Sequence, residues 1–489
     1  MSAYLGIDLG TSGLKALLLA DDHRVIASAS APLEVSRPAP LCSEQAPADW
    51  WGACCEALDA LAASHPAWMA KVRGIGLSGQ MHGAVLLDEN DAVLRPAILW
   101  NDGRSDLECS ELMTRCPALS RIAGNLAMPG FTAPKLAWIA KHEPALFART
   151  RCVLLPKDWL RLQLTGDKVS EMSDAAGTLW LDVARRDWSD ELLAATGMTR
   201  AQMPRLVEGS EISAQLKPAL CSRWGLPADV PVAGGAGDNA ASAVGIGAVA
   251  PGSGFLSLGT SGVLFVTNAA FRPNPALAVH AFCHALPARW HQMSVMLSAA
   301  SCLGWVSALC GRESESVLLD EVALLGVSAR PSAPIFLPYL SGERTPHNDP
   351  RAQGVFFGLG LGHGAADLGW AVLEGVAFAF RDGLAALEQA GTEVSCLSLV
   401  GGGARSRLWA QLLADVLRIE IRTHVDGEAG AALGAARLAW LADGAAPEYV
   451  CKAPPVLERF LPAPDVAELE ARYARFRALY LALKASFRS

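Results

Sequence analysis

A five-residue word, Leu-Gly-Thr-Ser-Gly, occurs twice in this 489-residue chain, at positions 9–13 and 258–262. The two copies lie about half the chain apart. Apolar residues precede and follow each copy, so residues 4–19 and 255–266 each predict two strands joined by a glycine-rich turn. Two matching hairpins at this spacing predict a duplicated fold built from two related domains.

The rest of the chain predicts an α/β fold, because strands and helices alternate in both halves. Strands are predicted at residues 72–77, 84–87 and 397–400, and helices from residue 47 and at residues 408–417, 433–441 and 465–487. Glycines cluster near residues 245–254, so we divide the chain into domains at residues 1–246 and 247–489. In such architectures, ligands bind in the cleft between the domains.

Composition limits the partners and the location. A net charge of −8, from 41 basic and 49 acidic residues, argues against nucleic acid but not against ATP, which needs only a local site. With 51% hydrophobic residues and no 18-residue apolar window, we expect a globular protein without a membrane span. The first residues do not resemble a secretory signal. Twelve scattered cysteines without a Cys-x-x-Cys pair favour a reduced, cytoplasmic enzyme.

Other familiar motifs find no support. His280, Cys283, His284 and His291 invite a zinc interpretation, but a second ligand pair is missing, and residues flanking a strand at 290–297 explain them better. No Gly-x-x-x-x-Gly-Lys-Ser/Thr sequence occurs, which excludes the P-loop kinases.

The repeated turn predicts a phosphate site. Its glycines expose several backbone N–H groups, and its threonine and serine add hydroxyls, which together suit a chain of phosphates. An ordinary hairpin turn would also use these residues. Two identical copies favour a nucleotide held from both sides, by Thr11 and Ser12 in the first turn and by Gly259 and Thr260 in the second.

The residues beside the two copies differ. Asp8 aligns with Ser257, and Lys15 aligns with Leu264, so only the first hairpin carries an acid and a base. Asp8 is placed to hold Mg²⁺ through water. Lys15 either steadies a phosphate or is a solvated lysine at the end of a strand.

A second acid, Asp238, follows the glycines of residues 234–237 and opens an Ala-rich helix. It is either a helix N-cap or a base that accepts the proton of a substrate hydroxyl, a role in which position matters more than strength. The glycines at 401–403 also follow a strand and open a helix, where an adenine or ribose could lie against the backbone.

A short loop at residues 79–83 separates two predicted strands. Met81 and His82 in this loop could contact a polyol, and Trp100 could wall a sugar pocket. A Met-His pair is more often part of a packed loop, so both interpretations stay open.

Together these segments resemble the carbohydrate kinases of the FGGY family. The resemblance runs from residue 4 to about residue 441, and it includes the specific stretch Pro-Tyr-Leu-Ser-Gly-Glu-Arg-Thr-Pro-His at 338–347. It implies two duplicated ribonuclease-H-like (actin-like ATPase) domains with a catalytic cleft between them. The implied roles are a catalytic base for Asp238, metal and phosphate contacts for Asp8, sugar contacts for Met81, His82 and Asn239, phosphate contacts for Thr11 and Thr260, and adenosine contacts for Gly402, Gly403 and Ser406.

Within the family, the chain resembles the xylulose kinases. Glycerol kinases carry Arg-Glu where Met81 and His82 stand, and Gln where Asn239 stands. The implied reaction is phosphorylation of D-xylulose to D-xylulose 5-phosphate, with ATP as co-substrate and Mg²⁺ as cofactor. A kinase for ribulose or a sugar alcohol, an actin-like ATPase without kinase activity, and an inactive sugar-binding regulator are the alternatives. A homodimer stays open, because no interface is identified.

Overall fold

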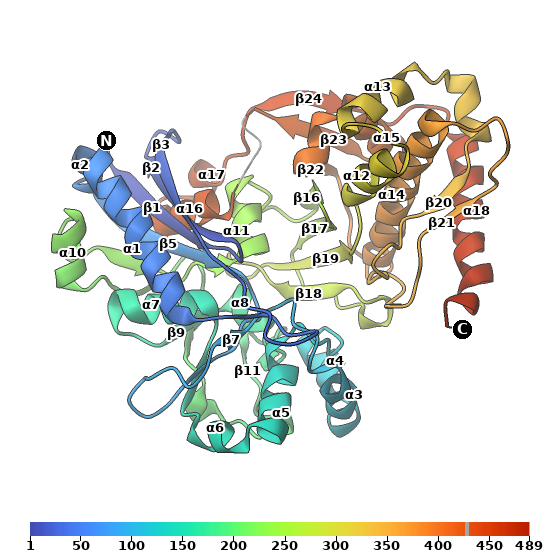
Figure 1. The fold of residues 1–489 in the computed structure, drawn as a ribbon. Helices are drawn as coiled ribbons and strands as arrows, with labels where there is room; N and C mark the ends of the chain where they lie inside the picture. The colour runs from blue at the N-terminus through green and yellow to red at the C-terminus, as the bar shows by residue number, and fades with distance from the viewer. Residues whose placement is uncertain (426–429, 489) are drawn as a thin grey trace.

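Two β-sheets, one from each half of the chain, form the frame of the molecule (Figure 1). The computed structural model describes residues 1–425 and 430–488, and within these ranges each sheet has seven strands. The first sheet runs β13-β14-β5-β1-β2-β3, with β15 paired to β5. Its strands are β1 (Ala3–Leu9), β2 (Gly13–Ala20), β3 (Val25–Pro32), β5 (Val72–Gly79), β13 (Ile212–Gln215), β14 (Pro231–Ala233) and β15 (Ala236–Gly237).

The second sheet repeats the arrangement of the first. Its order is β18-β19-β17-β16-β22-β23-β24. In both sheets a central strand, β1 or β16, has two successive antiparallel neighbours on one side and two parallel neighbours on the other. This shared topology confirms the predicted duplication. The strands are β16 (Ser253–Leu258), β17 (Gly262–Asn268), β18 (His280–Cys283), β19 (Trp290–Met296), β22 (Cys396–Val400), β23 (Glu420–His424) and β24 (Val456–Phe460).

The two hairpins with the identical word differ in register by one residue. In the first, Leu9 lies opposite Leu14, whereas in the second Leu258 lies opposite Gly262. A shift of one residue turns the following side chains to the other face of a sheet. The two turns have identical sequences, but the strands that follow them pair in different registers.

Helices cover both faces of the first sheet. Side chains alternate between the faces of a strand, so Leu5, Ile7 and Leu9 pack with helix α1 (Pro47–Ser64) on one face. Tyr4 and Gly6 face helix α16 (Ala431–Ala442) on the other. Asp8 follows the same alternation and lies on the α16 face, towards helix α11 (Asp238–Gly245).

Helix α16 belongs to the second half of the sequence but packs on the first sheet. A Cβ atom added to Gly6 would lie 1.9 Å from the Ala432 carbonyl oxygen, and one added to Gly76 would lie 1.8 Å from that of Ala435. The glycines therefore allow a close contact between helix and sheet. The domain boundary at residues 246/247 stays a prediction. Helix α16 comes after this boundary in the sequence but packs on the sheet that comes before it.

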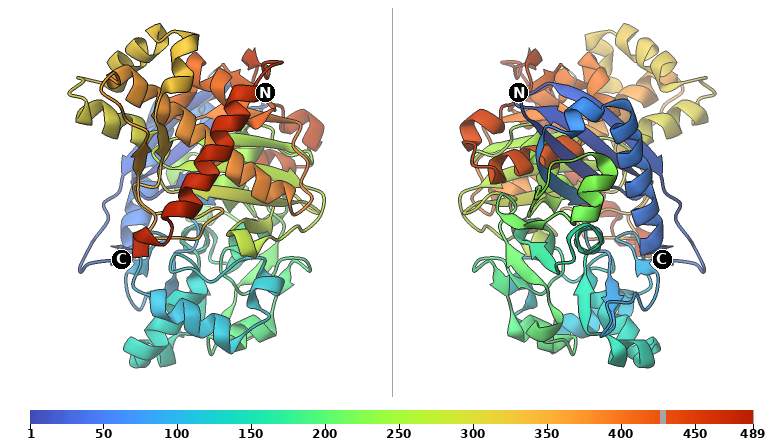
Figure 2. Two further views of the ribbon diagram at one scale, coloured as in Figure 1. Left: turned by 90° about the vertical axis from the view of Figure 1, so that its right-hand side faces the viewer. Right: turned by 90° about the vertical axis from the view of Figure 1, so that its left-hand side faces the viewer.

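The second half is covered by helices on its outer side, with α18 lying over them (Figure 2). No helix in the described ranges is both long and apolar enough to cross a bilayer. Besides α16, the helices of this half of the sequence are α12 (Ser301–Leu309), α13 (Glu315–Leu324), α14 (Ala365–Glu388), α15 (Arg407–Leu417), α17 (Pro447–Val450) and α18 (Ala467–Leu483), and its remaining strands are β20 (Ile335–Leu337) and β21 (Val355–Phe357).

Most of residues 80–210 form an extension below the first sheet (Figure 1), whereas helix α7 (Pro156–Thr165) of this segment packs beside α1 and β5. Its short strands pair two by two, and its helix α8 contacts β18 of the second half. Its strands are β6 (Val85–Leu87), β7 (Ala97–Ile98), β8 (Cys152–Leu154), β9 (Val169–Glu171), β10 (Leu181–Asp182), β11 (Asp187–Trp188) and β12 (Arg205–Val207), and β4 (Glu44–Gln45) pairs with β7. The other helices of the first half are α2 (Pro66–Met69), α3 (Asp106–Arg115), α4 (Leu119–Ala123), α5 (Thr132–His142), α6 (Pro144–Arg149), α7 (Pro156–Thr165), α8 (Met172–Ala176), α9 (Asp190–Ala195) and α10 (Pro218–Trp224).

Candidate active site

The carboxyl ends of three neighbouring strands bring the predicted residues of the first half together. Asp8 on β1 lies opposite Ser78 on β5, and Ser78 in turn lies opposite Ala236 on β15. The chain then continues from β5 into Met81 and His82, and from β15 into Asp238. The turn at residues 9–13, the Met-His loop and the head of α11 thus meet at one edge of the sheet.

Asp238 and Asp8 form a pair of carboxylates. Asp238 Oδ1 accepts hydrogen bonds from the backbone N–H of Asn239 at 2.7 Å and from its side-chain Nδ2 at 3.0 Å. Burial and the nearby charge of Asp8 raise the pKa of Asp238 to about 6. Burial also raises the pKa of Asp8, while the Lys15 ammonium group opposes this shift. A carboxylate with a pKa near 6 is ionised at neutral pH and can still take up a proton.

The donor set around Asp8 fits a cation that arrives with its own ligands. Asp8 Oδ1 is buried and has no hydrogen-bond partner among the residues that the structure describes. Within residues 1–425 and 430–488, no three His, Cys, Asp or Glu side chains gather in a way that would hold a metal ion by themselves. Mg²⁺ commonly binds through one or two carboxylates plus substrate phosphates and water, and one orphaned carboxylate oxygen suits that mode.

The Met81–His82 loop packs directly against the strand that leads to Asp238. A Cβ atom on Gly237 would lie 2.9 Å from Met81 Cγ, and one on Gly177 would lie 2.7 Å from the His82 ring and 2.8 Å from Met81 Cε. His82 has a left-handed backbone with φ of 70°. The loop is therefore tightly seated, and its Met81 side chain lies against the residue that precedes Asp238.

His82 is held as a neutral ring. Its Nδ1 donates to the carbonyl oxygen of Gly177 at 2.7 Å, and burial, followed by the charge of Lys135, lowers its pKa to about 3. Phe131 lies edge-on at 4.7 Å between ring centroids, and Phe282 of the second half lies at 6.3 Å. Because Nδ1 carries the proton, Nε2 is left to accept a hydrogen bond from a hydroxyl group.

Trp100 and Thr11 are joined in one polar network. Trp100 is 48% exposed, and its Nε1 donates to Thr11 Oγ1 at 2.9 Å. Thr11 Oγ1 donates to Gln80 Oε1 at 2.9 Å, and the Gln45 side chain donates to the Thr11 carbonyl oxygen at 2.7 Å. The Thr11 hydroxyl thus ties the turn to the Met-His loop, while Ser12 beside it is exposed.

The second turn and the glycines at 401–403 form a common surface in the other half. The carbonyl oxygens of Gly259 and Thr260 accept backbone hydrogen bonds from Ala300 and Ala299, and the Thr260 side chain is exposed. A Cβ atom on Gly403 would lie 2.4 Å from Leu258 Cγ, so this loop packs tightly beside the turn.

The remaining predicted adenosine residues lie on the same loop. Gly402 faces open space, because a Cβ atom there would meet nothing within 4 Å. Ser406 caps helix α15, and its Oγ accepts from Trp409 N at 3.3 Å. The cap explains Ser406 structurally, whereas the open position of Gly402 leaves room for a ligand.

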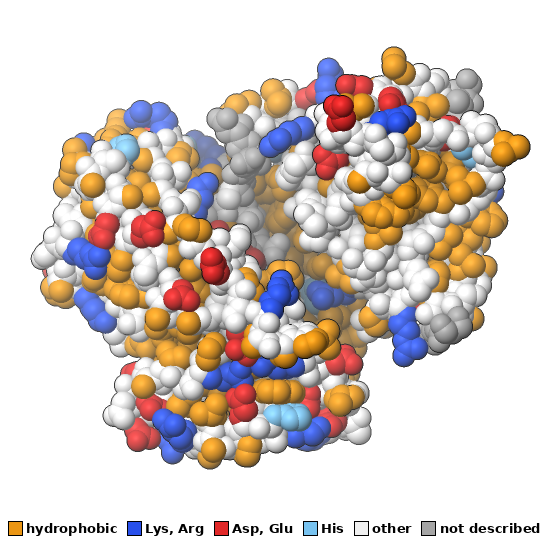
Figure 3. Space-filling view, viewed as in Figure 1, with side chains coloured by type: hydrophobic (Ala, Val, Ile, Leu, Met, Phe, Trp, Pro, Cys, Tyr) orange, Lys and Arg blue, Asp and Glu red, His pale blue; other side chains and the backbone are white. Residues whose placement is uncertain are grey.

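A cleft of about 350 Å³ lies between the two halves and is lined by residues of both. The space-filling view is hollowed between them (Figure 3). The first half contributes Lys15 and Asn239, and the second contributes Ser257 and Gly402. Asn239, which the resemblance implies at the sugar, therefore also lines the side that faces the adenosine residues.

One residue near the Met-His loop, Arg344, was not identified in the sequence. Arg344 lies in the 338–347 stretch, and its Nη1 is 3.4 Å from His280 Nε2, whose ring packs on Phe131 and Phe282. The family-like stretch at 338–347 marks this segment in the sequence. No local sequence pattern, however, predicts which residue Arg344 contacts.

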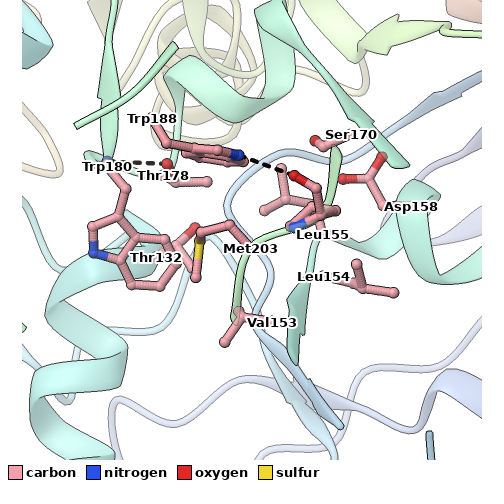
Figure 4. Close-up of a pocket in the computed structure, with 11 residues that line it drawn as sticks. Thr132, Val153, Leu154, Leu155, Asp158, Ser170, Thr178, Trp180, Trp188 and Met203 are labelled. Atoms are coloured by element: carbon pink, nitrogen blue, oxygen red, sulfur yellow. Dashed lines mark hydrogen bonds between the residues drawn. The ribbon is translucent and has the colours of Figure 1, made fainter. Parts of the chain in front are cut away.

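A small cavity beneath the loop is lined by Thr132, Asp158 and Trp180 (Figure 4). At about 10 Å³ it is too small for a sugar. The cleft between the halves is therefore the candidate ligand site.

Duplicated sheets, glycine turns at their adjoining edges, and a carboxylate pair next to Asn239, which lines the cleft, define a two-domain kinase of the actin-like ATPase fold. The chain belongs to the FGGY family of carbohydrate kinases: residues 3–245 match its N-terminal domain and residues 254–442 its C-terminal domain. It is accordingly a sugar kinase.

Individual relatives are similar over nearly the whole chain. A protein named xylulose kinase from Escherichia coli (strain K12) is 52% identical over 480 residues, 98% of each chain. One of the same name from Klebsiella pneumoniae is 54% identical over 439 residues, 90% of each chain. A crystal structure described as a xyloylose kinase from Brucella ovis has a TM-score of 0.96, with 53% identity over 99% of both chains.

Proposed function

We propose that the protein transfers the γ-phosphoryl group of ATP to the terminal hydroxyl of D-xylulose, giving D-xylulose 5-phosphate. The observation that carries this proposal is the seating of the Met81–His82 loop against Gly237, immediately before Asp238. The choice of D-xylulose is supported by the relatives named xylulose kinase.

Asp238 acts as the general base. Its carboxylate accepts the proton of the sugar hydroxyl as that oxygen attacks the γ-phosphorus, and the bond between the γ-phosphorus and the β,γ-bridging oxygen of ATP breaks. The pKa of about 6 leaves it ionised at neutral pH. The side chains of Met81 and His82 hold the sugar, with neutral His82 accepting a hydroxyl hydrogen through Nε2, and Trp100 and Asn239 complete the pocket.

The nucleotide lies between the two turns. Ser12 and the Thr260 side chain are exposed at their turns, and backbone N–H groups there suit phosphate oxygens. The adenosine lies against Gly402 and Gly403, in the cleft that both halves line. Asp8 would hold Mg²⁺ through water, and bound Mg²⁺ would neutralise charge on the phosphates.

A coupled assay of ADP release over ketoses, aldoses and sugar alcohols tests the proposal. We expect D-xylulose to give the highest kcat/KM, and Asp238→Ala to lower turnover by about 10²–10⁴-fold while ATP still binds. Near-normal turnover in Asp238→Ala would remove the base assignment. Preference for ribulose or a sugar alcohol would correct the substrate, and no stimulation by any sugar would exclude the kinase reaction.

Two further properties belong to this proposal. We place the enzyme in the cytoplasm, which is supported by its twelve free thiols. A homodimer is the proposed assembly, and light scattering of the purified enzyme would measure it.

A further inference from the structure

A cluster of buried charged side chains lies behind the loop that carries Asp238. Lys157 Nζ is 2.8 Å from Asp158 Oδ1, 2.9 Å from Asp174 Oδ2 and 3.4 Å from Glu171 Oε1. Arg161, one turn further along α7, completes the cluster, and all five side chains are fully buried. The enzyme mechanism described above uses none of them.

Two contacts connect this cluster to the two ends of the glycine loop at residues 234–237. At the first end, Arg161 donates to the carbonyl oxygens of Ala233 at 2.6 Å and Gly234 at 2.5 Å. At the second end, Ser173 Oγ accepts from the Gly237 N–H at 3.1 Å and donates to Glu171 Oε1 at 2.9 Å. The residue after Gly237 is Asp238 itself.

The loop needs such contacts because it has almost no side chains of its own. Gly235 has a left-handed φ of 78°, and a Cβ atom there would lie 2.1 Å from the Leu77 carbonyl oxygen. Glycine fits this close approach but leaves the backbone free to adopt many conformations. The hydrogen bonds to Arg161 and Ser173 restrict that freedom from outside the loop.

Stability alone is a weak reason for such a cluster. Removing charges from water costs free energy that a buried ion pair often does not recover, and well-packed apolar side chains can replace it. Burial raises the pKa of Asp174 well above its ordinary value, although the Lys157 charge opposes the shift. A role in holding the loop accounts for the cluster better than stability does, because Arg161 and Ser173 bond to the two ends of the loop.

We propose that Arg161 and Ser173 are positioning residues, which fix the 234–237 loop so that the Asp238 carboxylate is aligned with the sugar hydroxyl. Neither touches the substrate. The inference rests on the proposed role of Asp238 as the base. A displacement of about 1 Å at a reacting group can cost about 100-fold in rate, so a loop without side-chain packing benefits from being held at both ends.

The chain offers a matched pair of serines for the test. Ser173→Ala removes the contact with Gly237, whereas Ser170→Ala makes the same change three residues earlier. Ser170 is equally buried, and its hydroxyl has no hydrogen-bond partner among the described residues. We expect Ser173→Ala to lower kcat by about 10–100-fold, with KM for sugar and for ATP within about twofold of wild type. Ser170→Ala should keep kcat within about twofold.

Two readouts separate positioning from a general loss of structure. The acid limb of kcat should move to lower pH in Ser173→Ala, because a freed loop exposes Asp238 to water and lowers its pKa. Hydrogen exchange of peptides covering residues 232–240 should be faster in Ser173→Ala than in wild type or Ser170→Ala. Arg161→Lys, which keeps the charge but loses the two-pronged contact, should act in the same direction.

The outcomes are distinct. Equal losses in both serine variants, or a kcat loss in Ser173→Ala without faster exchange, would overturn the positioning role. So would wild-type kcat in Ser173→Ala. If wild-type enzyme shows no sugar-stimulated ADP release, the proposed function fails instead, and hydrogen exchange still reports whether Ser173 holds the loop.

Discussion

At the residue scale, the surroundings of Asp238 predict how turnover depends on pH. Burial and the charge of Asp8 raise its pKa to about 6. A base acts only when deprotonated, and kcat/KM reports the pKa of the free enzyme, so kcat/KM should fall as the pH drops through about 6 and stay level above it. Asp8→Asn removes the neighbouring charge, so the acid limb of the residual activity should move to lower pH.

The pH profile of kcat/KM measures this shift. Asp22→Asn is the control, because Asp22 is a surface carboxylate paired with Arg24. An acid limb that stays in place, or rises, in Asp8→Asn would contradict the coupling between the two carboxylates.

His82 provides a second prediction at this scale. Its ring is walled by Phe131 and bound at Nδ1 by Gly177, so it should affect the sugar and not the nucleotide. We expect His82→Ala to raise the sugar KM by about 10-fold, the value of one hydrogen bond of about 1.4 kcal/mol. The ATP KM should change less than about twofold, as should both constants in the exposed control His142→Ala. Equal increases in the two KM values would remove His82 from the sugar site.

At the element scale, the sequence predicts the two hairpins and several of the helices, but not the register of the strands. The helix predicted from Pro47 is α1, and its buried side chains include Trp50 and Leu58. The repeated word predicts two equal turns, yet their pairing differs by one residue. Local patterns fix where a strand lies, whereas the register depends on distant contacts, such as Gly262 against Phe380.

The contact between α16 and the first sheet gives a stability prediction. A methyl group on Gly76 would overlap the Ala435 carbonyl, so Gly76→Ala should force the helix and sheet apart and destabilise the protein by about 3 kcal/mol. Gly52 lies on the exposed side of α1 with nothing within 4 Å. Gly52→Ala should stabilise by about 0.5–1 kcal/mol, because alanine favours the helix.

Thermal and denaturant unfolding of the two variants measures these opposite changes in the free energy of unfolding. Destabilisation of similar size in both would contradict the close packing of α16 on Gly76 as the specific cause of the effect.

At the scale of the whole molecule, the sequence predicts the parts of the site better than their assembly. Asp8, Met81 and Asp238 could be identified because each stands next to glycines at the end of a strand. The cluster of Lys157 and Glu171 could not, because its members are ordinary charged residues whose proximity exists only in the folded chain. The crossing of α16 to the first sheet is hidden for the same reason, since alternating strands and helices do not say which sheet a late helix joins.

The cleft between the halves predicts a change in shape on binding. Lys15 and Asn239 line it from the first half and Ser257 and Gly402 from the second, so a nucleotide gripped from both sides draws the halves together. Closure would also exclude water from the γ-phosphate and limit hydrolysis without sugar. Small-angle X-ray scattering should show a smaller radius of gyration with D-xylulose and a non-hydrolysable ATP analogue together than with either alone. If scattering is unchanged when both ligands are saturating, the halves are already closed without ligands. Domain closure could then not explain a low rate of ATP hydrolysis in the absence of sugar, and the placement of Asp238 would have to explain it.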